Sequence, residues 1–222
     1  MGFLDRIAAK YLAEYGNTIH KVAFVFPTRR ARLYFERHLF KLKPKGENLW
    51  SPPMYSFGDF FASMSDLVVA EQLELIFELY AVYRQHVKQY PKEFEDFYPW
   101  GKMILGDFDE IDKYVVDTGT LFRTLKEFKS VEDITRDDKS PIYNRYTGFW
   151  QELGLIYRQF NRLLRAKGKA YEGMIYREVA EQMVNGKPRI SGTESTAIDN
   201  VTWDKVVFCG FNALTTAEET VI

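Results

Sequence analysis

The sequence predicts a mostly helical α/β protein, in which a small parallel α/β layer is interrupted by a large all-helical insertion. An unbroken apolar run at residues 22–26 and a second strand-like stretch at 205–209, Lys-Val-Val-Phe-Cys, lie toward opposite ends of the 222-residue chain. Such runs are typical of parallel strands that are covered on both faces. Between them, apolar residues recur almost entirely with helical spacing. Strands at both ends and helices between them indicate one layered unit that carries an insertion.

The N-terminal segment has the order helix, strand, helix. Residues 3–15 carry a helical stripe of apolar side chains, and residues 22–26 form the first strand. Pro27 cannot continue a strand ladder, and Thr28 is a suitable N-cap for a helix that we expect to run to about Leu42.

The middle of the chain is predicted to be helical. A short extended piece at 53–56 leads into a helix, and polar, turn-rich residues at 186–200 predict a loop. Further helices are expected at 68–89, 97–114, 117–128, 141–167 and 171–185. The aromatic residues of the helix at 141–167 recur at helical spacing, so we expect them to pack in the core, with base stacking as the alternative. They are Tyr146, Phe149, Trp150, Tyr157 and Phe160.

The predicted domains follow from this order. Residues 1–60 and 201–222 form a partial α/β layer, 61–185 form the helical insertion, and 186–200 form the loop. The sequence stops one turn into the helix that should follow the second strand, which suggests a fragment with an unfinished layer.

Composition points to a protein of the cytoplasm. The single cysteine, Cys209, cannot form an internal disulfide, which fits a reducing compartment, and we expect it to be a buried, inert thiol. No apolar run approaches the length of a membrane-spanning helix.

Charge is unevenly distributed along the chain, although the net charge is only −1. Residues 1–50 hold ten lysines and arginines against four acids, whereas residues 51–140 hold ten against eighteen. A basic N-terminal region and an acidic middle region are therefore the electrostatic features to explain.

Three arginines follow the first strand closely. Arg29, Arg30 and Arg32 fall in the first turns of a helix, where positive charge opposes the helix dipole. Phosphate oxygens would compensate these charges, because free backbone N–H groups and guanidinium groups both bind phosphate. The alternative is that the arginines pair with the acidic middle region.

Signatures of catalysis are missing from the sequence. No G-x-x-x-x-G-K-[ST] string occurs in the chain, so a phosphate-binding loop for ATP is excluded. The acidic stretch Asp107, Asp109, Glu110 and Asp112 has no neighbouring histidine and lacks the spacing of a calcium loop. We therefore expect these acids to form a solvated helix face or to pair with the N-terminal arginines, and we predict no catalytic residue, no metal site and no cofactor.

Two short motifs resemble parts of a superfamily I helicase core. Residues 26–31, FPTRRA, resemble the segment after a strand that grips single-stranded nucleic acid in that family. Residues 54–60, MYSFGDF, are similar to a second motif, with Ser56 in place of a threonine and Gly58 in place of a histidine. The resemblance implies an incomplete 1A-like layer with a large 1B-like helical insertion.

The resemblance also implies an inactivated helicase. The strand at 205–209 would carry two metal-binding acids in active members, but Gly210 and Phe211 stand at its end. Without those acids to bind Mg²⁺ and without the lysine loop to bind the β- and γ-phosphates, we expect no ATP hydrolysis.

Longer phrases, such as VFPTRRARLYF and PWGKMILGDFDEID, are similar to AddB-like subunits of AddAB/RecBCD-type helicase–nucleases, of the Bacteroidetes branch. Full-length relatives implied by this resemblance end in a PD-(D/E)XK nuclease domain with an iron–sulfur cluster. The single cysteine here cannot hold such a cluster.

The resemblance implies a non-catalytic portion that holds DNA, single-stranded or at a duplex end, during double-strand break repair, beside an AddA-like helicase subunit. It also implies that three arginines contact phosphates, that Thr28 and Ser56 donate hydrogen bonds, and that Phe57 stacks on a base. The implied DNA-binding residues are thus Thr28, Arg29, Arg30, Arg32, Ser56 and Phe57. One alternative is a protein-interaction module that docks an ATPase partner without touching DNA. Another is a metal-dependent nuclease that uses Asp107, Asp109 and Glu110.

Overall fold

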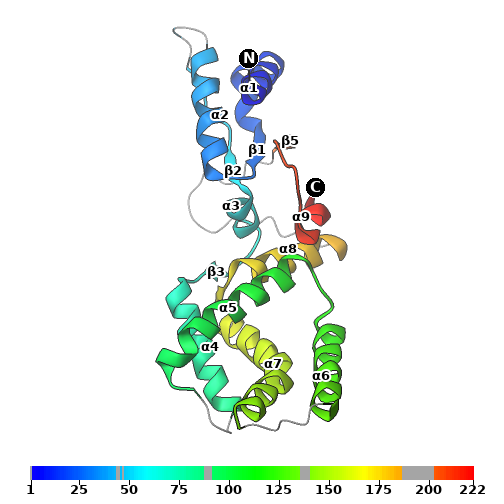
Figure 1. The fold of residues 1–222 in the computed structure, drawn as a ribbon. Helices are drawn as coiled ribbons and strands as arrows, with labels where there is room; N and C mark the ends of the chain where they lie inside the picture. The colour runs from blue at the N-terminus through cyan, green and yellow to red at the C-terminus, as the bar shows by residue number, and fades with distance from the viewer. Residues whose placement is uncertain (1, 44–45, 47, 88–91, 136–140, 187–202) are drawn as a thin grey trace. The chain divides into compact units, whose positions relative to one another are not determined.

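A computed structural model describes residues 2–43, 46, 48–87, 92–135, 141–186 and 203–222. For 128–135 and 141–151 it describes only the helical backbone. The chain divides into two compact units, with the first boundary between Met64 and Ser65. Unit 1 holds the elements before that boundary together with strand β5, and unit 2 holds the elements up to α8 together with α9. Figure 1 labels these elements.

Unit 1 is a three-stranded parallel sheet with helices packed on it. Its elements are α1 (Phe3–Tyr15), the 3-10 helix η1 (Gly16–Lys21), β1 (Val22–Phe26), α2 (Arg29–Leu42), β2 (Met54–Ser56), α3 (Phe57–Ala62) and β5 (Lys205–Phe208). The strand order is β2-β1-β5, so β1 is central. All five residues of β1 are fully buried, as its unbroken apolar run predicts.

The core of unit 1 lies between β1 and the two long helices. Phe24 and Phe26 of β1 pack on Phe35 of α2, with ring centroids 4.7 Å and 5.0 Å apart. Tyr11 of α1 meets the edge of Phe24 at 5.2 Å. This packing determines that the side of α2 that carries Phe35 faces the sheet.

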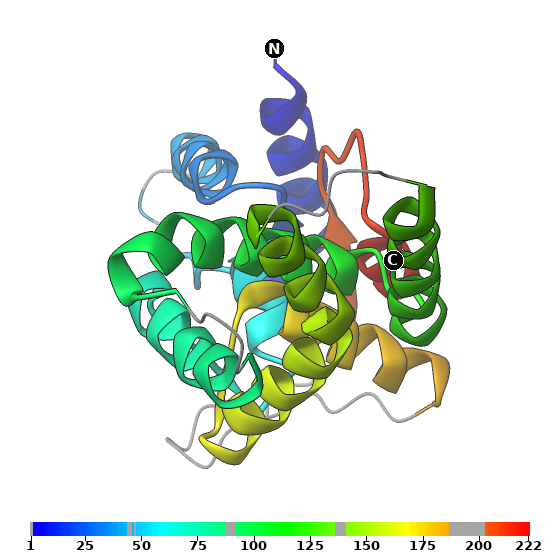
Figure 2. The same cartoon turned by 60° about the horizontal axis from the view of Figure 1, so that its bottom comes forward.

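Unit 2 is helical apart from one short strand pair. Its elements are β3 (Val68–Val69), α4 (Gln72–His86), α5 (Phe94–Lys113), α6 (Thr118–Thr135), α7 (Pro141–Ala166), β4 (Lys169–Ala170), α8 (Glu172–Val184) and α9 (Thr216–Val221). Helices α4 to α7 come forward in Figure 2. Fully buried Phe97, Phe108 and Phe160 form much of the core.

A buried charge lies inside unit 2. The Asp112 carboxylate is fully buried, and Arg177 Nε donates to its Oδ1 at 2.6 Å. The hydroxyl groups of Tyr157 and Tyr171 also donate to this carboxylate. Arg177 further donates to the backbone carbonyl groups of Ile111 in α5 and of Val116 just after α5. A buried charge of this kind is stable only when it is paired and hydrogen-bonded.

Most predicted elements are present, with three corrections. The helix predicted at 68–89 begins only at Gln72, because Val68 and Val69 pair with β4 as a parallel strand. Strand β4 itself was not predicted. Helix α9, which we placed in the α/β layer, belongs to unit 2, where it packs on α8.

The mixed α/β class is confirmed at the level of a mostly helical chain with a small parallel sheet. The predicted core role of the α7 aromatics is confirmed for Tyr157 and Phe160, which are buried. The other three aromatics of that group, and the predicted loop except for Gly186, lie outside the residues whose side chains are described.

Candidate nucleic-acid interface

The register of the sheet brings the two predicted motifs together. Strands β1 and β2 are parallel, and Phe26 pairs with Ser56 at their carboxyl ends. The first turns of α2 and α3 therefore start at the same end of the sheet (Figure 1). This is the end at which ligands bind in open parallel sheets.

Both helices begin with a hydroxyl cap. Thr28 Oγ1 accepts from the Ala31 backbone N–H at 3.2 Å, which confirms the predicted N-cap of α2. Ser56 Oγ accepts from the Asp59 N–H at 3.3 Å and caps α3 in the same way. The caps hold the two helix starts in fixed positions on the sheet edge.

Arg29 is held by an ion pair across this edge. Its Nη2 lies 2.8 Å from Asp59 Oδ1, and its Nε donates to Oδ2 at 3.4 Å, so the guanidinium fork grips both oxygens. Hydrogen bonding from Arg29 lowers the pKa of Asp59, and the hydrogen bond from Ser56 lowers it further. Partial burial of the carboxyl group acts in the opposite direction. The charge of Arg29 is therefore already balanced.

The other two arginines have different surroundings. Arg32 is half-buried and donates to the Met54 carbonyl oxygen at 3.4 Å. The exposed Arg30 side chain has no hydrogen-bond or ion-pair partner in the described part of the chain. Thr28 is exposed too, and its hydroxyl hydrogen has no acceptor among the residues described. Arg30 and Thr28 are thus two exposed predicted contacts that keep free donors among the described residues.

The structure does not support the predicted roles of Ser56 and Phe57. Phe57 is only 2% exposed and packs on Phe61, Phe208 and Phe211, so its ring faces are covered by protein. Ser56 is buried, and its hydroxyl donates to Asp59 Oδ2 at 2.6 Å. Both side chains hold the sheet edge together instead of presenting groups to a ligand.

Asp59 is the residue that the sequence reasoning missed. It lies in the acidic middle region, so the alternative of arginines pairing with that region holds for Arg29. The spacing from Ser56 to Asp59 is the S-x-x-D pattern of a helix start, and that signal could have identified the carboxylate.

The acidic stretch of α5 is not a solvated face throughout. Asp107 and Glu110 are exposed, but Asp112 is buried against Arg177. Asp109 Oδ1 accepts from the Gly173 N–H at 2.6 Å, and its Oδ2 lies 2.9 Å from Lys113 Nζ. Within the part of the chain that the structure describes, no three potential ligands gather to hold a metal ion.

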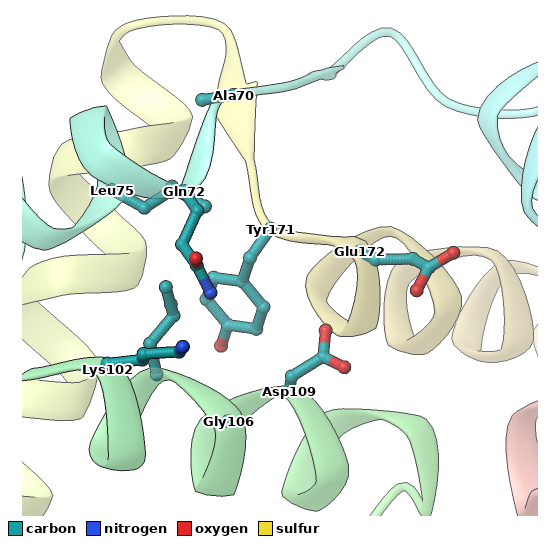
Figure 3. A pocket seen from close by; sticks show the side chains of 9 residues that line it. Ala70, Gln72, Leu75, Lys102, Gly106, Asp109, Tyr171 and Glu172 are labelled. Atoms are coloured by element: carbon teal, nitrogen blue, oxygen red, sulfur yellow. The ribbon is translucent and has the colours of Figure 1, made fainter.

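A pocket of about 370 Å³ opens beside this stretch in unit 2. Figure 3 shows Asp109, Glu172, Lys102 and Gln72 around its wall. The Tyr171 hydroxyl at its base is already bonded to Asp112 and to Asn161, the latter at 2.9 Å. Asp109 and Tyr171 therefore link the wall of the pocket to neighbouring elements of unit 2.

The remaining predictions concern Cys209 and membranes. Cys209 is buried as predicted, and desolvation raises the pKa of its thiol to about 12, so the reactive thiolate is suppressed. Among the helices as far as they are described, none has the length and apolar character needed to cross a bilayer.

A scan against protein-family models and a search of curated proteins each found no match to this chain.

Proposed function

We propose that this chain is a non-catalytic, DNA-binding and scaffolding portion of an AddB-like helicase–nuclease subunit that serves double-strand break repair and recombination. The observation that carries the proposal is the exposed Arg30 at the carboxyl ends of two adjacent parallel strands, beside the free hydroxyl hydrogen of Thr28. A phosphate group is the ligand that a guanidinium, a hydroxyl and a helix start bind in common.

The role of the site is to hold a DNA backbone. Arg30 and Thr28 contact phosphate, while the Arg29–Asp59 pair keeps the starts of α2 and α3 together. Such contacts carry no sequence information, so binding is sensitive to salt and tolerant of sequence. An AddA-like helicase subunit is the partner that would supply ATP-driven movement.

The test is binding of a fluorescent single-stranded oligonucleotide to the full chain at low salt. Wild type should bind, and Arg30→Gln should weaken binding about tenfold, in line with the loss of one charge-assisted phosphate contact. Arg158→Gln is the control, because Arg158 is also exposed on a helix but lies in unit 2. No binding by wild type, or equal loss in both variants, would refute the proposal.

A second candidate is a protein-interaction module that docks an ATPase partner without DNA contact. Leu73 and Phe77 of α4 favour it, because both are about half exposed one helical turn apart. Phe77 also stacks on Phe94 of α5, with ring centroids 4.6 Å apart. In this case partner binding would follow the acidic region 93–138 and these apolar residues, and would be unchanged in Arg30→Gln.

A further inference from the structure

We infer that single-stranded nucleic acid lies along the outward face of α2, where Arg37 and Lys41 contact its phosphates and Tyr34 and Phe40 stack on its bases. This inference rests on the proposed function and extends the site from the start of α2 along its length. None of these four residues was among the predicted contacts.

Helix geometry defines the outward face. Phe35 and Leu39 of α2 point into the core, and successive residues turn by about 100°. The side opposite these two spans an arc of about 140° by the same geometry. The side chains that fall in this arc, here called the α2 outer face, are Arg29, Arg30, Leu33, Tyr34, Arg37, Phe40 and Lys41.

The α2 outer face is exposed and positively charged. All seven of its residues are exposed, and none is acidic; the two neighbouring acids are Asp59, which pairs with Arg29, and the half-buried Glu36 of α2 at its border. Apart from Arg29, these side chains make no hydrogen bond, ion pair or ring contact with the described part of the chain. In a chain of net charge −1, this concentration of unpaired cations is complementary to a polyanion.

The rings on this face favour single strands over a duplex. Tyr34 is 46% exposed and Phe40 is 49% exposed, which is high for aromatic rings, and both lie among the cations of this helix. Aromatic side chains between basic groups bind single strands because unstacked bases can lie on the rings, whereas duplex bases stay stacked with one another.

The size of the face also suits a short strand. From Arg30 to Lys41 it extends about 17 Å at the rise of an α-helix. That length matches about five phosphates of a stacked strand at about 3.4 Å spacing. The cations at both ends and in the middle, with rings between them, match the alternation of phosphate and base.

The first experiment tests the rings. An oligothymidylate of about 16 nucleotides, a typical upper site size for one binding domain, is titrated with the full chain. Tyr34→Leu and Phe40→Leu should each weaken binding about tenfold, and Tyr34→Trp should restore it, because stacking needs an aromatic ring and not only an apolar one. Tyr114→Leu is the matched control, since Tyr114 is 52% exposed in unit 2.

The second experiment tests the cations. Arg37→Gln with Lys41→Gln should weaken the same complex. The control is Arg158→Gln with Arg162→Gln, an exposed pair with the same helical spacing, which should leave binding unchanged because it lies in unit 2. A duplex of equal length should bind more weakly and should not respond to the ring variants.

The outcomes separate this inference from the proposed function. If wild type binds and Arg30→Gln weakens binding, but the ring and charge variants bind like wild type, the path along α2 is refuted and the phosphate site stands. If wild type does not bind oligonucleotide, both fail. Equal binding of duplex, or ring-dependent binding to anionic phospholipid vesicles without oligonucleotide binding, would also overturn the inference.

Discussion

Arg29 and Arg30 are adjacent in the sequence, yet they have different functions in the structure. Arg29 forms an ion pair with Asp59, whereas Arg30 has no partner among the described residues. The ion pair fixes a sheet edge, and the free cation is left for a ligand. A cluster of like charges in a sequence therefore needs a structure before its members can be assigned separate roles.

The pKa of Asp59 provides a test at this scale. Hydrogen bonding from Arg29 lowers that pKa below the ordinary value of about 3.9. The pair therefore stabilises the fold fully above that ordinary value, and this contribution is lost as pH falls through the lowered pKa. In an NMR titration of the Asp59 carboxyl carbon, Arg29→Gln should raise the pKa, and Arg30→Gln should leave it unchanged. An Asp59 pKa at or above the ordinary value in wild type would contradict the ion pair.

Residue types predicted the polar end of the first strand, but they did not reveal which side chains are accessible. The cap at Thr28 and the burial of β1 follow from local chemistry, and both were predicted. The burial of Phe57 depends on Phe208 and Phe211, which are distant in sequence, so local patterns could not show it. The exposed rings of α2 could have been found from helical spacing around Phe35 and Leu39.

At the scale of elements, α5 and α8 meet at a position that requires glycine. A Cβ at Gly173 would lie 2.9 Å from Asp109 Cα and closer still to the Asp109 carbonyl oxygen. The Gly173 N–H also donates to the Asp109 side chain across this contact. The close approach places Asp112 of α5 beside Arg177 of α8, and so permits the buried ion pair.

Gly173→Ala should therefore destabilise the protein, by about 1–3 kcal/mol, because the neighbouring atoms are backbone and cannot rotate away. Gly106→Ala is the control on α5, since nothing lies within 4 Å of the Cβ that it would add. That substitution should stabilise the helix by about 0.5–1 kcal/mol. Urea denaturation measures both, and equal effects of the two substitutions would contradict the proposed crossing.

Elements differ in how well the sequence predicts them. Long periodic helices such as α1 and α2 were predicted with their observed bounds, because amphipathic spacing alone defines them. Strands β3 and β4 have two residues each, and their pairing joins residues about 100 positions apart. No local pattern marks so short a pair, which is why Val68 and Val69 were assigned to a helix.

At the scale of the whole molecule, the charge asymmetry of the sequence corresponds to two chemically different units. The basic N-terminal region supplies the α2 outer face in unit 1. Much of the acidic middle region lies in unit 2, where Asp109 and Asp112 pair with Lys113 and Arg177. A polyanion is therefore expected to bind unit 1, and the acids of unit 2 contribute partly to its own stability.

The salt dependence of single-strand binding tests the central claim most directly. Each phosphate contact contributes about −0.7 to the slope of log K against log salt concentration. With the three cations Arg30, Arg37 and Lys41 of the α2 outer face engaged, wild type should give a slope of about −2, and Arg30→Gln should reduce its magnitude by about 0.7. A wild-type slope near zero, or a slope that Arg158→Gln reduces as much as Arg30→Gln, would contradict a phosphate-binding surface at the end of the first strand.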